Sequence, residues 1–211
     1  MALLIIDSLI ETTSKILVAS RNFDRNVTAV KLIETNNNKI DELTRLRELL
    51  NFDIFLSHAF KDANLVAGIM IELIKMGYTV YVDWIIDPHL GRENVNKATA
   101  DALVKRMNQS KSLFYATTVN APHSKWMPWE LGYKHGHNGK CAILPIKEHS
   151  YSSDIFTGQE YLGIYDKVIK TTALWICPEA NSNLSDCKLF DIWAGVTRRK
   201  IQTLRDLYVT L

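Results

Sequence analysis

The sequence predicts an α/β domain in which helices cover both faces of a five-stranded parallel sheet. Short apolar runs alternate with amphipathic segments from Phe52 onward, which is the pattern of strands joined by helical crossovers. The 211 residues can bury one main core with appendages. The content of 47% hydrophobic and 23% charged residues is ordinary for a globular protein. These three observations favour one central domain over two equal ones.

The expected strands and helices alternate along the central part of the chain. Gly77 is the expected C-cap of the first connecting helix. Crossovers of this length make the connections right-handed and the sheet parallel. With the strand order 2-1-3-4-5, a ligand is expected in the crevice outside the carboxyl ends of the first and third strands. The strands are expected at residues 53–57, 78–83, 112–117, 141–146 and 161–169, and the helices at 65–76, at 95–107 and around Glu130 as far as about His135.

Helical patterns flank this central domain on both sides. Apolar residues recur at helical spacing over 3–19, and a second helical pattern precedes the first strand. Near the other end, Ser185 or Asp186 can cap a last helix. The apolar faces of these extensions are expected to pack on the domain or on another copy of the chain. The expected units are an N-terminal helical extension at 1–50, the central domain at 51–170 and a C-terminal helical tail, packed on the domain, at 171–211.

Charge and cysteine content narrow the range of partners. The formal charge of +2 arises from 25 basic and 23 acidic residues that are mixed along the chain, so nucleic acid is not expected as a partner. Cys141, Cys177 and Cys187 are an odd number of cysteines without a CxxC pair, which fits reduced thiols in a cytoplasmic protein. No disulfide is therefore expected. No apolar run is long enough to cross a bilayer, and no membrane partner is expected.

Trp126 and Glu130 form the most informative pair in the chain. Residues four positions apart share one face of a helix, so the indole and the carboxylate are expected to point at the same object. A flat indole beside a carboxylate suits a ligand that is aromatic and cationic, such as nicotinamide dinucleotide. The alternative is that Trp126 only packs and that Glu130 complements the positive end of the helix dipole.

Several other residues could serve the same crevice. His58 follows the first strand and could contact a phosphate or a ribose, or could only hydrogen-bond the backbone. Lys61 and Arg92 could offer positive charge to a pyrophosphate, or could be solvated surface charges. Asp83 and Asp87 could shape a binding loop or belong to a plain turn.

A histidine-rich stretch gives only a faint indication of zinc. His135 and His137 lie near His123 and Cys141 in the sequence. Their spacing fits no closed tetrahedral set, so no metal site is expected.

Three segments together resemble the Toll/interleukin-1 receptor (TIR) domain family. Residues 53–59 resemble its first strand, residues 77–83 its second strand and residues 124–132 its third-helix motif. The resemblance is firm from Phe52 to Ile146 and weaker to about Ile169. It implies a flavodoxin-like, three-layer fold, in agreement with the periodicity of the chain.

The resemblance also implies roles for particular residues. Glu130 occupies the position of the glutamate that enzymatic TIR domains need at the start of the third helix, which implies that it is catalytic. Trp126 and Trp129 would then stack on the ligand or form a pocket wall. Other residues implied at the nucleotide site are Ser57, His58, Ala59, Lys61, Asp83, Trp84 and Arg92. The loop from 83 to 92 would cover the site, and its 84–92 part would mediate contacts between subunits.

The chemistry of NAD+ cleavage fits a carboxylate at this position. Nicotinamide is a cationic leaving group, so bond cleavage builds positive charge on the ribose, much as in glycoside hydrolysis. A fixed carboxylate stabilises that charge. We expect Glu130 to act in its ionised form, helped by a place in the first turn of a helix.

The stand-alone prokaryotic TIR proteins of Thoeris antiphage defence are the subgroup that the chain resembles. The resemblance implies an NAD+ nucleosidase, or ADP-ribosyl cyclase-like hydrolase, that converts NAD+ into a cyclic or conjugated ADP-ribose-derived signal for a separate effector. It further implies self-association through the 84–92 loop and the helical extensions, a phage-derived trigger, and no cofactor beyond the substrate NAD+. The alternatives are simple NAD+ depletion and a non-enzymatic TIR scaffold that binds other proteins.

Overall fold

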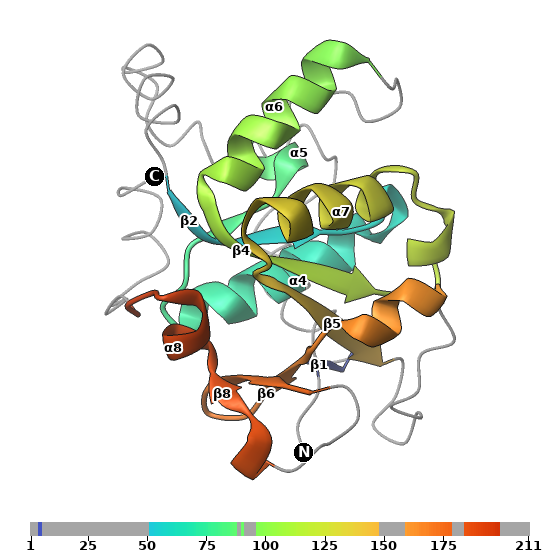
Figure 1. Ribbon diagram of the computed structural model, residues 1–211. Coiled ribbons are helices and arrows are strands. Elements are labelled where there is room, and N and C mark those ends of the chain that lie inside the picture. The colour runs from blue at the N-terminus through green and yellow to red at the C-terminus, as the bar shows by residue number, and fades with distance from the viewer. Residues whose placement is uncertain are drawn as a thin grey trace, which may run out of the picture.

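The computed structural model describes residues 4–5, 51–87, 90, 96–147, 159–178 and 184–198. Its strands form one eight-stranded sheet with helices on both faces (Figure 1). The strands are β1 (Leu4–Ile5), β2 (Phe52–Ser57), β3 (Val80–Tyr81), β4 (Ser110–Thr117), β5 (Cys141–Lys147), β6 (Lys167–Lys170), β7 (Leu174–Cys177) and β8 (Lys188–Leu189). The α-helices are α4 (Ala63–Lys75), α5 (Asp83–Ile86), α6 (Lys97–Asn108), α7 (Trp126–Asn138) and α8 (Phe190–Ala194). The 3-10 helices are η1 (Phe60–Asp62), η2 (Ala121–His123), η3 (Glu160–Ile164) and η4 (Leu184–Asp186).

The α/β fold class and the predicted order of the five parallel strands are confirmed. The sheet has the order β3-β2-β4-β5-β6-β7-β8, with β1 paired to β5, and the pairings from β3 to β6 are all parallel. In chain order the first five of these strands read 2-1-3-4-5. The carboxyl ends of β2 and β4 therefore lie side by side, and Ser57 is directly opposite Tyr115. The sheet differs from the prediction in its extra strands β1, β7 and β8.

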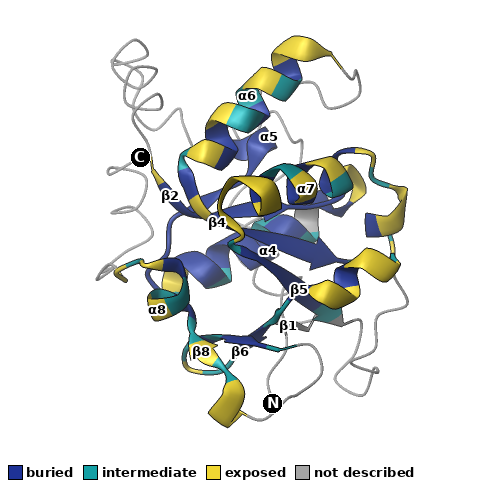
Figure 2. Ribbon diagram, in the orientation of Figure 1, coloured by how far each residue is buried: buried dark blue, intermediate teal, exposed yellow. Residues whose placement is uncertain are grey.

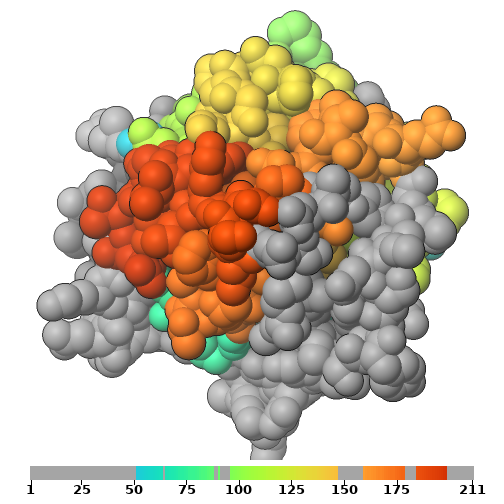
Figure 3. Space-filling model, turned by 60° about the horizontal axis from the view of Figure 1, so that its bottom comes forward, coloured from blue at the N-terminus to red at the C-terminus, as the bar shows by residue number. Residues whose placement is uncertain are grey.

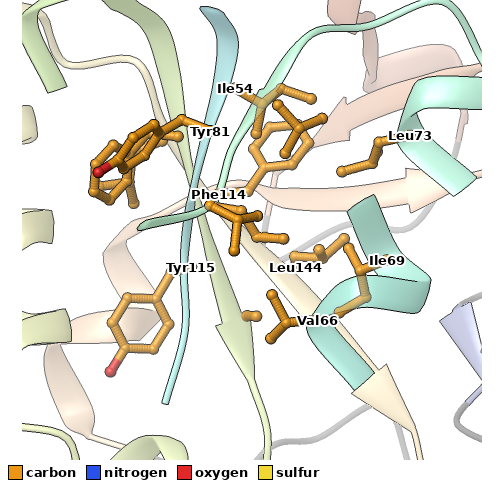
Figure 4. Packing of buried hydrophobic residues seen from close by; sticks show 14 of the residues in the cluster. Ile54, Val66, Ile69, Leu73, Tyr81, Phe114, Tyr115 and Leu144 are labelled. Carbon is orange, nitrogen blue, oxygen red and sulfur yellow. The ribbon is translucent and has the colours of Figure 1, made fainter. Parts of the chain in front are cut away.

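The core lies on both faces of the central strands, which are largely buried, while the outer faces of α6 and α7 are exposed (Figure 2). Alternation along β2 and β4 sends successive side chains to opposite faces. On one face, Ile54 and Phe114 meet Leu73 of α4, whereas Tyr81 and Tyr115 point to the other face (Figure 4). α6 and α7 cover that second face.

Two predicted strands differ in extent from those in the structure. The strand expected at 78–83 is limited to Val80–Tyr81, because Asp83 begins α5 and an acidic residue favours the first turn of a helix. The strand expected at 161–169 starts later, at Lys167, because η3 occupies Glu160–Ile164. Asp83 and Trp84 thus belong to a buried helix and not to a loop.

The predicted helix from Ser185 onward is wrong over residues 188–189 and from Gly195 to 198, and the part of it beyond 198 lies outside the described residues. β7 and β8 pair antiparallel, so Lys188 and Leu189 are in a strand where the sequence predicts a helix. α8 has only five residues and ends at Gly195, whose φ of 66° is the left-handed conformation that glycine adopts readily. Phe190 is fully buried in the core beside Tyr78 and Phe114, so this segment packs on the sheet.

The predicted N-terminal helix over 3–19 is wrong at Leu4 and Ile5, which form β1 and pair with Ile146 and Lys147 of β5. The rest of residues 1–50 lies outside the described residues. The division of the chain into three units stays a prediction. Within the described residues, no helix combines the length and the apolar character needed to cross a membrane.

The structure also corrects the prediction that the chain has no disulfide. Cys177 and Cys187 are bonded to each other, with a Cα–Cα distance of 4.3 Å. The antiparallel register of β7 and β8 explains the bond, because the pairs Trp175–Leu189 and Ile176–Lys188 place the two cysteines opposite each other at the next position. The sequence pattern could not indicate this pairing because β7 and β8 were not expected. Cys141 is free and buried.

We expect Cys187→Ser to lower the free energy of unfolding by about 2–3 kcal/mol under oxidising conditions, because the bond closes a short loop and restricts the unfolded chain. Urea unfolding with and without a thiol reductant measures the effect. With reductant, wild type and variant should become equally stable. A wild type that is unaffected by reductant would show that this bond adds no stability.

Candidate active site

The centre of the candidate site is a hydrogen bond between two residues that are 73 positions apart. The Ser57 hydroxyl, at the end of β2, donates to Glu130 Oε2 of α7 at 2.6 Å. Both side chains are fully buried, with 0% exposure. Charge-assisted hydrogen bonds of this length are among the stronger ones in proteins. The predicted convergence of residues from the first strand and the third helix is thus present in the structure.

α7 places Trp126 and Glu130 on the same buried side of the helix. Trp126 is the first helical residue and is 8% exposed, and Glu130 follows one turn later. The prediction that Glu130 lies in the first turn is wrong, since the first turn of α7 contains no acidic residue. The helix-dipole effect is largest within that turn. The local support that the structure gives this carboxyl group is therefore the hydrogen bond from Ser57, not the helix dipole.

Trp129 lies at the edge of this arrangement. Its side chain is 38% exposed, and its ring meets the Trp126 ring edge-on, with centroids 5.5 Å apart. On its other side it stacks with Tyr133 at 6.1 Å. An indole that is partly exposed beside a buried one can offer its free face to a ligand.

His58, which directly follows β2, contacts Asp83, the first residue of α5. His58 Nδ1 lies 2.8 Å from the Leu56 carbonyl oxygen, and His58 Nε2 lies 3.3 Å from Asp83 Oδ1. A carbonyl oxygen only accepts, so Nδ1 carries a proton. This buried histidine–carboxylate pair fixes the start of α5 against the end of β2.

The end of α5 is fixed by a buried ion pair that sequence reasoning missed. Arg106 of α6 donates to both carboxylate oxygens of Asp87, with distances of 2.7 and 2.8 Å, and the Tyr81 hydroxyl donates to the same carboxylate at 3.0 Å. The first part of the expected covering loop at 83–92 is therefore helical, over Asp83–Ile86, and is anchored at Asp87. Arg92 lies outside the described residues.

The loops after β2 and β4 meet close to Ser57, as the predicted crevice requires. Asp62 of η1 accepts hydrogen bonds from the side chains of Thr118 and Asn120. Ala59 is buried, whereas Lys61 is exposed to solvent. The structure thus brings the two loops together but places the Lys61 side chain on the surface.

Tyr115 is a further residue of this site that the sequence reasoning missed. It is fully buried and pairs in register with Ser57, so it faces α7 from the sheet. Burial, the Tyr161 hydroxyl and the negative charge of Glu130 raise the pKa of Tyr115 far above its ordinary value. The phenol therefore stays protonated. The sequence alone does not show that Tyr115 lies opposite Ser57, because this pairing depends on the register of β2 and β4.

Lys134 anchors α7 one turn beyond Glu130. Its ammonium group is fully buried and donates to the main-chain carbonyl oxygens of Met107, at 2.7 Å, and of Ser110. These carbonyls lie where α6 ends and β4 begins. Burial lowers the pKa of Lys134 to about 8. The spacing of Glu130 and Lys134 in the sequence gives no indication that both are buried.

The arrangement presents one carboxylate held in place and covered by protein. Because Glu130 is 0% exposed, a substrate can reach it only after covering atoms move. Within the described ranges no group of three or more histidine, cysteine, aspartate or glutamate residues could hold a metal ion. The chemistry that such a site can perform is electrostatic: stabilisation of a positive charge and acceptance of a proton.

Comparisons with known proteins give two relatives. A protein of Bacillus cereus strain MSX-D12, named "Probable 3' cyclic ADP-D-ribose synthase ThsB'", is 42% identical over 168 residues, which are 80% of this chain and 83% of that protein. A protein of Cytobacillus dafuensis, named "Putative cyclic ADP-D-ribose synthase TIR2", is 33% identical over 105 residues, which are 49% of this chain and 26% of that protein. No protein-family model matches the chain.

We expect Ser57→Ala to lower the free energy of unfolding by about 1.5–3 kcal/mol, because a buried carboxylate loses a hydrogen-bond donor. Ser112→Ala is the matched control, since the Ser112 hydroxyl is equally buried but donates to the neutral carbonyl oxygen of Asp53 at 2.8 Å. Chemical unfolding of both variants makes the comparison. Equal losses would contradict the assignment of an ionised Glu130.

We expect Lys134→Met to change how stability depends on pH. Between a folded pKa of about 8 and the ordinary value of 10.5, the unfolded chain holds a proton that the folded chain has lost. Stability from this group therefore rises with pH in that window, by at most about 1.4 kcal/mol per pH unit. Between pH 7 and pH 9, the free energy of unfolding of wild type should therefore rise relative to that of Lys134→Met, as chemical unfolding at each pH would measure. A constant difference would contradict the lowered pKa.

Proposed function

The chain belongs to the TIR family, among its Thoeris-type proteins, and on this premise we propose that it is an enzyme that cleaves the nicotinamide–ribose bond of NAD+. The single observation that carries the proposal is the buried hydrogen bond from Ser57 to Glu130 at 2.6 Å. It holds a carboxylate at the carboxyl ends of the central strands, which is where open α/β sheets bind their ligands.

In the proposed reaction the C–N bond between the ribose and nicotinamide breaks, and its electron pair leaves with nicotinamide. Positive charge builds on the ribose, and Glu130 stabilises it. Trp126 lies on the same side of α7, with Trp129 at its edge, and this arrangement supports a role for an indole in contacting the aromatic part of the substrate. Ser57 keeps the carboxylate oriented without neutralising it.

The proposed product is a cyclic ADP-ribose. The names of both relatives, cyclic ADP-D-ribose synthases, support this choice over linear ADP-ribose or a conjugate with another molecule. In ring closure a nucleophilic atom of the same dinucleotide replaces nicotinamide at the ribose carbon. If that atom is a hydroxyl oxygen, its proton passes to Glu130.

The proposed setting is antiphage defence, in which the product acts as a signal for a separate effector protein. Activation by a phage component, self-association through the 84–92 loop and the helical extensions, and a cytoplasmic location are parts of the same proposal. His58 and Asp83 serve it by fixing the end of β2. Ala59, Lys61, Trp84 and Arg92 remain proposed neighbours of the nucleotide.

We expect Glu130→Gln to reduce nicotinamide release from NAD+ by about a hundredfold or more, the size of effect seen when a preorganised electrostatic group is lost. The amide oxygen of the substituted side chain can still accept from Ser57, so the fold should persist. Glu72→Gln on α4 is the matched control, because Glu72 pairs with Lys75 and Lys170 away from the site. Mass spectrometry of NAD+, nicotinamide and ADP-ribose products provides the measurement.

The assay should use both purified protein and infected cells that express it. Cyclic product that depends on Glu130 supports a signalling enzyme, and linear product alone favours NAD+ depletion. A folded protein that gives no Glu130-dependent product in either setting would leave the non-enzymatic scaffold as the better explanation.

A further inference from the structure

A cluster of two tyrosines and a glutamine lies next to the Glu130 site and has no role in the function proposed so far. The Tyr115 hydroxyl donates to Gln159 Oε1 at 3.0 Å, and the Tyr161 hydroxyl donates to the same oxygen. Gln159 directly precedes η3, whereas Tyr115 belongs to the central strand β4. One amide oxygen thus ties η3 to the centre of the sheet.

The buried end of this cluster faces the candidate carboxylate. Tyr115 pairs with Ser57 in the β2–β4 register, and Ser57 is hydrogen-bonded to Glu130. A phenol has a single proton to donate, and Tyr115 donates it to Gln159. Gln159 and its neighbour Tyr161 therefore fix the direction in which the Tyr115 hydroxyl points.

The other end of the cluster reaches the surface. Tyr161 is 38% exposed, whereas Tyr115 is fully buried. η3 lies against α7, because the His135 ring meets the Tyr165 ring edge-on at 5.4 Å, and the two elements adjoin on the face shown in Figure 3. The cluster thus extends from a partly exposed side chain, Tyr161, to the buried strand residue that lies opposite Ser57.

We propose that Gln159 is a positioning residue that holds Tyr115 and Tyr161 together, keeps water away from the buried Glu130 carboxylate on the side of η3, and so favours ring closure over hydrolysis. This inference rests on the proposed function. In both reactions the ribose C–N bond breaks and nicotinamide leaves with the electron pair. In ring closure an atom of the same dinucleotide forms the new bond. In hydrolysis a water oxygen forms it and one water proton goes to Glu130, so the water content of the pocket decides the product.

The test compares the ratio of cyclic to linear ADP-ribose among variants. Gln159→Met keeps the length of the side chain but removes the acceptor oxygen, and Tyr115→Phe removes the inner donor. Gln159→Glu keeps an acceptor and serves as the rescue variant. Tyr133→Phe is the matched control, because its hydroxyl donates to Asn108 Oδ1 at 2.9 Å, away from the cluster. Thermal unfolding verifies that each variant is folded.

We expect the cyclic-to-linear ratio to fall by about fivefold or more in Gln159→Met and Tyr115→Phe, the change that corresponds to loss of about 1 kcal/mol. Gln159→Glu and Tyr133→Phe should keep the wild-type ratio. A wild-type enzyme whose ratio is unchanged by Gln159→Met, even if total turnover falls, overturns the inference alone. A wild type that releases no nicotinamide overturns the proposed function, and the inference with it.

Discussion

The buried Glu130 carboxylate is the constraint on which the arrangement of this site depends. A charge removed from water is costly unless hydrogen bonds replace its hydration. Ser57 supplies one such bond at 2.6 Å, although its strand β2 lies far from α7 in the sequence. The bond exists only if β2 ends beside the first turns of α7. The site therefore depends on the strand order of the sheet, which places β2 beside β4.

The elements around the carboxylate are fixed by buried polar contacts of their own. Lys134 fastens α7 to the junction of α6 and β4, and Arg106 fastens α6 to Asp87 at the end of α5. His58 joins the start of α5 to β2. A buried ion pair such as Arg106–Asp87 adds little net stability, but removing one partner of it, or of the Lys134 hydrogen bonds to main-chain carbonyls, leaves a buried polar group uncompensated and so penalises alternative placements. We interpret these contacts as devices that define the positions of α5, α6 and α7 around the site.

The periodicity of the sequence was sufficient to predict the parallel strands, and the usual order of an open sheet placed the ends of the first and third strands together, whereas the shared site of Ser57 and Glu130 was implied by the family resemblance. The sequence was insufficient where the outcome depends on register or on tertiary partners. Tyr115 is adjacent to Ser57 only through the β2–β4 pairing, and the Cys177–Cys187 bond follows from an antiparallel pair that local patterns did not reveal. The helix expected from Ser185 was wrong because strand pairing and Gly195 outweigh apolar spacing there.

The covered state of Glu130 bears on how a substrate would approach. Ser57 and Tyr115 belong to central strands that are buried on both faces, and moving them would disrupt the core. Trp129 and Tyr161 are each 38% exposed and lie on α7 and η3, nearer to solvent. Displacing partly exposed side chains exposes less new apolar surface than opening the sheet, so it costs less free energy. Movement of such outer side chains thus leaves in place the strands that carry Ser57 and Tyr115, and with them the hydrogen bond that holds the carboxylate.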